Sequence, residues 1–157
     1  MKIVLQKVRE AAVKVNGEVQ GQIQKGVCLL IGVEKGDGEE EARYLAKKIA
    51  QLRIFPDKEG KMNLSLQDVQ GGVLAVSQFT LASSVKKGRR PSFDRAAPPE
   101  KAERLFLYLV NQLKEKGLPV ETGVFGAMMD VQLTNEGPVT FILQDKSGKG
   151  DSPQSDF

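Results

Sequence analysis

The stretch AAVKVNGEVQGQI, residues 11–23, decides the fold of this 157-residue chain. Apolar and polar side chains alternate on both sides of Asn16-Gly17, and alternation with a period of two is typical of a half-buried strand. Asn-Gly between two such runs is the strongest short-range hairpin signal, because a type I′ turn needs positive φ at both central residues. The sequence therefore predicts an antiparallel β-hairpin near the start of the chain.

Further strands and two helices are predicted outward from this hairpin. The strands lie at residues 3–5, 27–33 and 72–81, and at 129–133 and 139–143 around a turn at Asn135 to Pro138. One helix is expected to begin near Asp37, with a capping box formed by Asp37 and Glu40, and the other at Pro98-Pro99. Because strands and helices do not alternate regularly, we expect an α+β fold with a mainly antiparallel, β-barrel-like sheet and two packed helices.

The chain contains no histidine, and this absence excludes more than any other feature of its composition. A Ser-His-Asp triad, a Cys-His pair and histidine-based metal sites are impossible, and the single Cys28 cannot form an internal disulfide or a thiolate cage. We expect neither a metal nor a cofactor. Proton transfer near pH 7 must use a carboxylate, a lysine, a tyrosine, the backbone, water or the substrate.

Location and domain organisation follow from similar arguments. No apolar run approaches the roughly 20 residues of a membrane span, and Lys7 and Arg9 lie where a signal peptide would continue apolar. Cys28 lies in an apolar run, which suits a reduced, buried thiol. We expect a soluble cytoplasmic protein without a membrane partner, with one domain at 1–145 and a polar, disordered tail at 146–157.

Polar residues end the strand predicted at 72–81, in the motif SQFTL (residues 77–81). One interpretation makes Ser77 or Thr80 a nucleophile, or makes the backbone here an oxyanion hole. The other is a strand end whose hydroxyl groups are satisfied locally. A nucleophile needs a base, and no histidine is present to serve as one.

Two glycine-containing segments offer backbone to a ligand. Gly137-Pro138, in NEGPVTF (135–141), is either a simple turn or a cis peptide that directs two carbonyl groups to one side, where they can accept from an ammonium group. The segment TGVFGAMM (122–129) permits close backbone approach, with Phe125 packing on a flat ring, or it is a bulge at the edge of the core.

A short basic run follows the SQFTL motif. Its members are Lys86, Lys87, Arg89 and Arg90, with Phe93 just beyond. Basic residues bind phosphate groups and an aromatic ring can stack on a base, so the run predicts contacts with nucleic acid. A solvated surface loop is the alternative.

Together these segments resemble the D-aminoacyl-tRNA deacylase family, once called D-tyrosyl-tRNA deacylases. The resemblance runs from Met1 to about Gln144 and rests on SQFTL and NEGPVTF, with support from GVEKGD (32–37), RIFPDKEGKMNLS (53–65) and RRPSF (89–93). It implies a homodimer of barrel-like subunits whose active sites lie at the subunit interface. It also implies hydrolysis of the ester between a D-amino acid and the 3′-terminal adenosine of tRNA, and of glycyl-tRNA, including glycine mischarged on tRNA-Ala.

The resemblance further implies a role for each segment. A Gly-cisPro pair inserted from the opposite subunit excludes L-amino acids, and here it maps to Gly137 and Pro138. The pocket, where backbone N–H groups stabilise the oxyanion and the tRNA 2′-OH assists, maps to Ser77, Gln78, Phe79 and Thr80. The region that receives the terminal adenosine maps to Phe125, Gly126, Ala127 and Met129.

One position departs from the family pattern. Where the family is expected to carry Gln-Arg-Val, with the arginine supporting the Gly-Pro pair, this chain has Gln6-Lys7-Val8. Lys7 keeps the charge but lacks the planar fork of donors.

Two other interpretations of the function stay open. One is an esterase with Thr80 as nucleophile and relaxed chirality, and the other is a non-catalytic RNA-binding module that uses the basic run.

Overall fold

The computed structural model describes residues 1–145, and the tail predicted at 146–157 lies outside the described residues. The elements in chain order are β1 (Lys2–Val15), β2 (Glu18–Ile23), β3 (Gly26–Gly32), α1 (Glu39–Gln51), β4 (Arg53–Pro56), β5 (Met62–Ser65), β6 (Gly72–Ser77), the 3-10 helix η1 (Phe79–Ala82), α2 (Pro99–Glu115), β7 (Val120–Thr122) and β8 (Asp130–Gln144). No helix within residues 1–145 has the length and apolar character needed to cross a membrane.

The predicted hairpin is present. β1 and β2 pair antiparallel, with Val15 opposite Glu18, and the connecting Asn16 and Gly17 have φ values of +50° and +79°. Positive φ at both positions is the geometry for which Asn-Gly is favoured. The apolar run 27–33 becomes β3, which is buried over nearly its whole length, as predicted.

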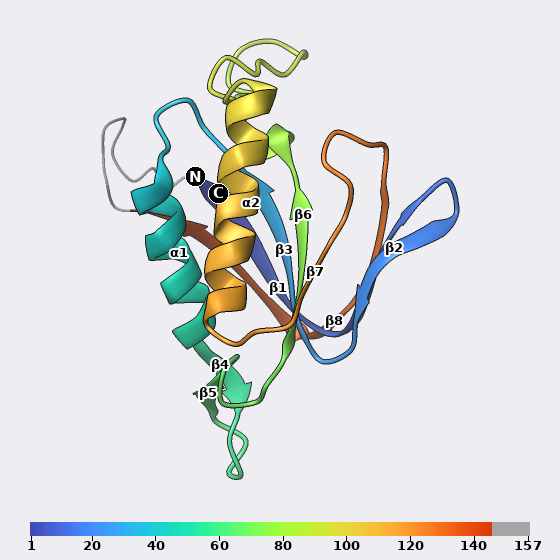
Figure 1. Ribbon diagram of the computed structural model, residues 1–157, viewed down its shortest axis with the longest axis vertical. Helices are drawn as coiled ribbons and strands as arrows, with labels where there is room; N and C mark the ends of the chain where they lie inside the picture. Colours follow the sequence, from blue (N-terminus) through green and yellow to red (C-terminus); the bar gives the residue numbers. More distant parts are fainter. Residues whose placement is uncertain (146–157) are drawn as a thin grey trace.

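β1 is the central strand of a six-stranded, barrel-like sheet (Figure 1). β3 pairs with the first half of β1 and β2 with its second half, while β8 follows the other edge of β1 along most of its length. β6 joins β3, and β7 joins β6, in parallel pairings. Most strand pairs are thus antiparallel, as predicted, and β3 and β6 end at the same edge of the sheet.

The two helices pack against each other across one face of the sheet (Figure 1). Their apolar stripes, represented by Leu45 of α1 and Leu105 and Leu109 of α2, are fully buried in the main core. A smaller core on the opposite face includes Val13 and Leu74. Burying each large aliphatic side chain stabilises the fold by about 1.5–3 kcal/mol, so these cores hold rigid the sheet ends that carry the loops.

The start of α1 differs from the prediction. Gly38, not Asp37, precedes the first helical residue, and its N–H donates to Oε2 of Glu41 at 2.7 Å. Asp37 is buried, accepts the N–H of Glu34 at 2.6 Å and pairs with the amino group of Met1. The predicted capping box of Asp37 and Glu40 is therefore wrong, because a long-range contact holds the Asp37 carboxylate.

Two predictions about the later strands also need correction. The strand expected at 72–81 ends at Ser77, and η1 follows it. The turn expected at Asn135 to Pro138 does not reverse the chain, because Asn135 pairs with Val8 and Thr140 with Gln6 in one continuous antiparallel direction. Residues 136–139 stand opposite Lys7 alone, and we call this extended bulge of β8 the Gly-Pro bulge.

Candidate functional site

The SQFTL motif forms a turn at the end of a buried strand, and we call residues 77–80 the polar turn. The N–H of Gln78 donates to the carbonyl of Ile31 at 2.8 Å, which fastens the turn to β3. The amides of Phe79 and Thr80 lie at the start of η1, and within the described part of the chain neither donates to a protein acceptor. Two unpaired N–H groups at the start of a helix can bind a developing oxyanion.

The hydroxyl of Thr80 has a hydrogen-bond partner but no base. Nε2 of Gln78 donates to Oγ1 of Thr80 at 2.5 Å, and no carboxylate in residues 1–145 is hydrogen-bonded to this hydroxyl. Cys28 is no substitute nucleophile, because burial raises the pKa of its thiol to about 11. The geometry therefore favours backbone stabilisation of charge over attack by a side chain.

Gly32, at the end of β3, is a residue whose role the sequence did not reveal. A Cβ at this position would lie 2.8 Å from Cβ of Leu81 and 3.0 Å from the carbonyl oxygen of Gln78. Both distances are shorter than an ordinary contact, so only glycine lets the polar turn and η1 pack this closely against β3. Its one sequence signal was its place in the GVEKGD motif.

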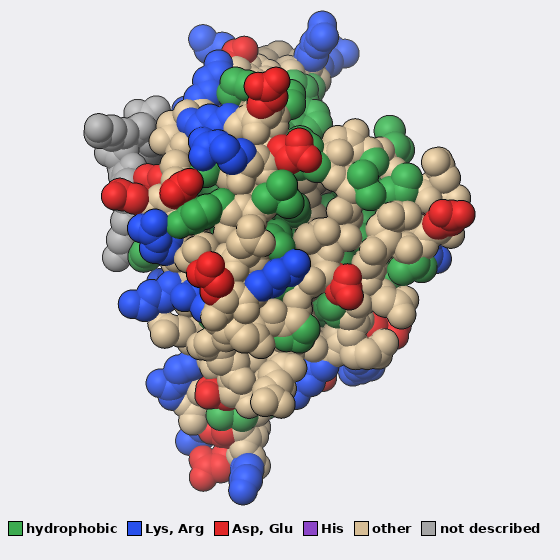
Figure 2. All heavy atoms as spheres, viewed as in Figure 1, with side chains coloured by type: hydrophobic (Ala, Val, Ile, Leu, Met, Phe, Trp, Pro, Cys, Tyr) green, Lys and Arg blue, Asp and Glu red, His purple; other side chains and the backbone are tan. Residues whose placement is uncertain are grey.

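Residues 84–92 leave the polar turn as a loop that we call the basic hairpin. Ser84 and Ser92 exchange two backbone hydrogen bonds of 2.8 and 2.9 Å at its base. It carries the exposed side chains of Lys86, Lys87, Arg89 and Arg90. Figure 2 shows Lys and Arg side chains projecting at the end of the molecule where Figure 1 draws this loop. Exposed cations in this number are suited to phosphate groups.

The segment expected to receive the terminal adenosine leaves the sheet beside the polar turn. β7 runs parallel to β6, and its last residue, Thr122, pairs with Ala75, two residues before Ser77. The ring of Phe125 is half-buried, with its centroid 6.2 Å from that of Phe106 in α2. Of the remaining residues predicted here, Gly126 is exposed and Ala127 and Met129 are half-buried.

The Gly137-Pro138 peptide bond is cis, and both residues are exposed on the Gly-Pro bulge. Asn135 braces the bulge, since its Oδ1 accepts the N–H of Val139 at 2.7 Å and its Nδ2 donates to the carbonyl of Val139 at 3.2 Å. Nδ2 also lies 3.0 Å from Oγ1 of Thr140. Asn135 was not predicted as a site residue, because these contacts depend on the shape of the bulge.

Lys7 lies opposite the bulge in the register of β1 and β8, but its side chain is buried against the ring of Phe55. Its Nζ is 5.9 Å from the ring centroid of Phe55, and Nζ of Lys25 is 5.7 Å from the same centroid. Within residues 1–145, Lys7 makes no side-chain hydrogen bond to Gly137 or Pro138. Lys7 is therefore near the bulge only because β1 and β8 pair there, and not through a side-chain contact.

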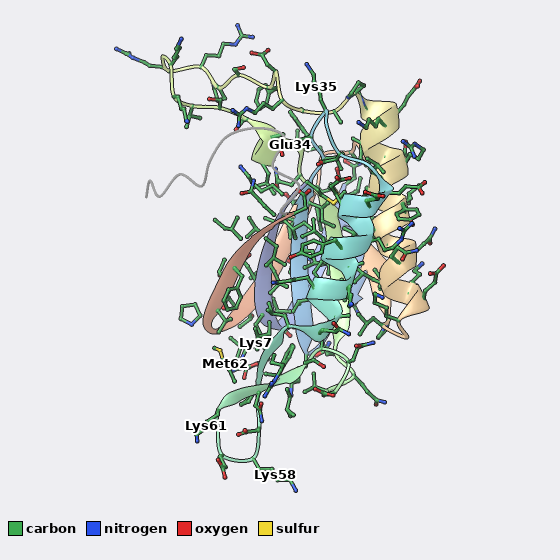
Figure 3. The ribbon with its side chains drawn as sticks, turned by 90° about the vertical axis from the view of Figure 1, so that its left-hand side faces the viewer. Lys7, Glu34, Lys35, Lys58, Lys61 and Met62 are labelled. Carbon is green, nitrogen blue, oxygen red and sulfur yellow. The ribbon has the colours of Figure 1, made fainter. Side chains whose placement is uncertain are left out.

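The predicted site residues fall at two ends of one subunit. Lys2 of β1 pairs with Gly32 at the end that carries the polar turn, and Lys7 lies five residues further along the strand. Five residues of strand span about 17 Å. Figure 3 shows Glu34, which follows β3, and Lys7 towards opposite ends of the sheet. The polar turn, the basic hairpin and residues 125–129 share one end, and the Gly-Pro bulge and Lys7 lie towards the other.

The candidate site is an open surface in a single subunit. A groove of about 300 Å³ between β1, β2 and β8, lined in part by Glu10, Gln22 and Gln132, contains none of the predicted site residues. The described residues offer no group of three or more Cys, Asp or Glu that could hold a metal ion.

Residues 4–144 match the family model described as D-Tyr-tRNA(Tyr) deacylase. The chain is 57% identical over 150 residues to a protein from Geobacter metallireducens named D-aminoacyl-tRNA deacylase, which covers 96% of this chain and 99% of the relative. A protein of the same name from Halalkalibacterium halodurans is 58% identical over 146 residues, covering 93% of this chain and 100% of the relative.

Two solved structures have the same architecture. A chain described as c-Myc DNA Unwinding Element Binding Protein superposes with a TM-score of 0.87 at 40% identity, covering 92% of this chain and 99% of that one. A chain described as "a probable eukaryotic D-amino acid tRNA deacylase" superposes with a TM-score of 0.80 at 19% identity, covering 92% and 98%. The second likeness concerns the fold alone.

Proposed function

The chain belongs to the D-Tyr-tRNA(Tyr) deacylase family, and from this premise we propose that it hydrolyses the ester of D-aminoacyl-tRNA to free D-amino acid and tRNA. The observation that carries the proposal is the family match over residues 4–144, nearly all of the described chain. The structure supports it with two unpaired amides at the polar turn beside an exposed group of cations. The substrate would place the reaction in the cytoplasm, where tRNA is used.

Catalysis in this proposal relies on the main chain. The aminoacyl ester is already activated, so the enzyme needs to supply only modest assistance. The N–H groups of Phe79 and Thr80 stabilise the oxyanion that forms when water attacks the carbonyl carbon. The 2′-OH of the terminal ribose helps to position or activate that water, which fits a chain that contains no histidine. Ser77 and Gln78 line the same pocket.

Replacing Thr80 with valine tests the competing nucleophile mechanism. We expect the variant to keep kcat within about tenfold of the wild type, because the backbone N–H remains and valine preserves the β-branched shape. The loss should reflect only the hydrogen bond from Gln78. Release of D-tyrosine from D-tyrosyl-tRNA measures the rate. A folded variant with no residual activity would favour Thr80 as nucleophile.

The chiral filter is proposed to come from a second subunit. The Gly-Pro bulge lies about 17 Å along the sheet from the end that carries the polar turn, too far to contact the same ester within one chain. In a homodimer, Gly137 and Pro138 of one subunit can enter the pocket of the other and exclude an L side chain. A glycyl ester has no side chain to exclude, so glycyl-tRNA, including glycine on tRNA-Ala, is also a substrate. Lys7 belongs to this filter by its place on β1, between Gln6 and Val8, which pair with the two ends of the bulge.

The tRNA is held on both sides of the polar turn. The cations of the basic hairpin, Lys86, Lys87, Arg89 and Arg90, contact phosphate groups. The segment that contains Phe125, Gly126, Ala127 and Met129 receives the terminal adenosine, and it leaves β7 beside the polar turn.

The deciding experiment compares D-tyrosyl-tRNA, L-tyrosyl-tRNA and glycyl-tRNA-Ala in one assay. Release of D-tyrosine and glycine but not L-tyrosine supports the proposal. Release from both tyrosyl substrates would indicate a relative with relaxed chirality, and binding without release would indicate an RNA-binding module. Light scattering on the same preparation tests the homodimer, and a monomer that discriminates D from L would exclude the cross-subunit filter.

A further inference from the structure

The ring of Phe93 has no part in the function proposed above, yet it packs on the polar turn. Its centroid lies 5.2 Å from that of Phe79, with the ring planes inclined at 54°. Offset and tilted arrangements at this distance are the ones that aromatic pairs favour. Both rings stay accessible, Phe79 at 57% and Phe93 at 40% of their surface.

The backbone that carries Phe93 is anchored to the core. The N–H of Ala96 donates to the carbonyl of Phe93, and the N–H of Ala97 to the carbonyl of Val33, each at 3.0 Å. The N–H of Lys35 donates to the carbonyl of Arg95 at the same distance. Residues 93–97 are thereby fixed to the segment that directly follows β3. These hydrogen bonds fix the backbone position of Phe93, even though the residue follows an exposed hairpin.

The polar turn consequently has a contact on each of two sides. The absent side chain of Gly32 lets it pack against β3, and the ring of Phe93 contacts its outward-facing ring. η1 is a single 3-10 turn, a conformation with weaker hydrogen-bond geometry than an α-helix, so its orientation depends on such contacts. Because Phe79 carries one of the two unpaired amides, holding its ring also restricts the direction of that N–H.

The same contact links the polar turn to the basic hairpin. The hairpin leaves the turn at Ser83, is closed by the pairing of Ser84 with Ser92, and reaches Phe93 immediately afterwards. The contact between the two rings is therefore a second link across the base of the hairpin, beside the pairing of Ser84 with Ser92. One of these rings belongs to Phe79, which carries an unpaired amide. The ring contact therefore joins the hairpin directly to the turn.

We infer that Phe93 is a positioning residue for the deacylation: it holds Phe79 so that its amide faces the reacting ester, and it couples the tRNA-binding hairpin to that amide. The inference rests on the proposed function for the chemistry it serves. The support itself is a property of the free protein, and it can be measured without any substrate.

The test compares Phe93→Ala, which removes the ring, with Phe93→Tyr, which keeps it. Hydrogen exchange in the free protein is followed on a peptide that spans residues 78–83, in which the amides of Gln78, Leu81 and Ser83 are protected by hydrogen bonds. We expect roughly tenfold faster exchange of these amides in the alanine variant only. With D-tyrosyl-tRNA, the alanine variant should lose kcat about tenfold while KM changes less than threefold, and tyrosine should restore kcat. Leu107→Ala, which shortens another exposed apolar side chain, is the matched control and should change neither quantity.

Three results would overturn the inference. They are unchanged exchange in Phe93→Ala, an effect on KM alone, and a tyrosine variant as impaired as the alanine variant. Circular dichroism and thermal unfolding confirm that each variant is folded, and Phe93→Leu replaces the alanine variant if that one is not. If the wild-type protein releases no D-tyrosine, the proposed function fails, and the exchange measurement alone still decides whether Phe93 holds the turn.

Discussion

Replacing Gly137 with alanine is expected to lower the preference for D- over L-tyrosyl-tRNA by on the order of 100-fold. Gly137 has φ of +142°, a conformation that L side chains rarely adopt, and an added Cβ would lie 2.6 Å from Cγ2 and 2.9 Å from N of Val139. Val139 cannot easily yield, because it is buried and its N–H donates to Asn135. The Gly-Pro bulge must therefore move, and a displacement of about 1 Å is enough to cost such a factor.

Gly17→Ala is the matched control for this variant. Gly17 also has positive φ, +79°, but an added Cβ would meet nothing within 4 Å, and the residue lies in the β1–β2 turn. It should lose about 1–2 kcal/mol of stability and keep the full chiral preference. The measurement is the release of each tyrosine enantiomer from its own charged tRNA. A Gly137→Ala protein that is folded and discriminates like the wild type would show that the bulge is not the filter.

Elements whose geometry depends on adjacent residues could be predicted from the sequence. Asn16-Gly17 encodes its own turn, and the apolar run 27–33 encodes a strand buried on both faces. β4, β5 and β7 were missed because each has only three or four residues and depends on pairing with another segment. The cap of α1 was wrong for a similar reason, since Asp37 is held by Met1, 36 residues away.

For the candidate site too, the sequence identified local motifs but not the contacts between distant segments. The SQFTL and NEGPVTF motifs identified which residues to examine, but only the register of β1 with β3 and β8 shows that they lie at different ends of the sheet. The contacts of Asn135 with the bulge, of Gly32 with η1 and of Phe93 with Phe79 are all tertiary. A residue whose role is to leave space, such as Gly32, has no chemical signature that a single sequence can reveal.

Gly32→Ala is expected to lower kcat for D-tyrosyl-tRNA by on the order of 100-fold with little change in KM. The added Cβ would lie 2.8 Å from Cβ of Leu81 and 3.0 Å from the Gln78 carbonyl oxygen, and neither atom is the flexible end of a side chain. The turn must shift outward as a unit and carry the amides of Phe79 and Thr80 with it. The phosphate contacts of the basic hairpin should remain available, so binding should suffer less than the chemical step.

Gly36→Ala, four residues further along the chain, separates this effect from the general cost of losing a glycine. An added Cβ at Gly36 would meet nothing within 4 Å, so its kinetics and melting temperature should stay close to the wild type. Gly32→Ala itself should lose about 1–3 kcal/mol of stability, the usual cost of overpacking, and remain folded. If that folded variant kept the wild-type kcat, the amides of the polar turn would not be the groups that stabilise the oxyanion. A fall in kcat with KM preserved would assign the catalytic contribution to the backbone of the turn, since no functional side chain has been changed.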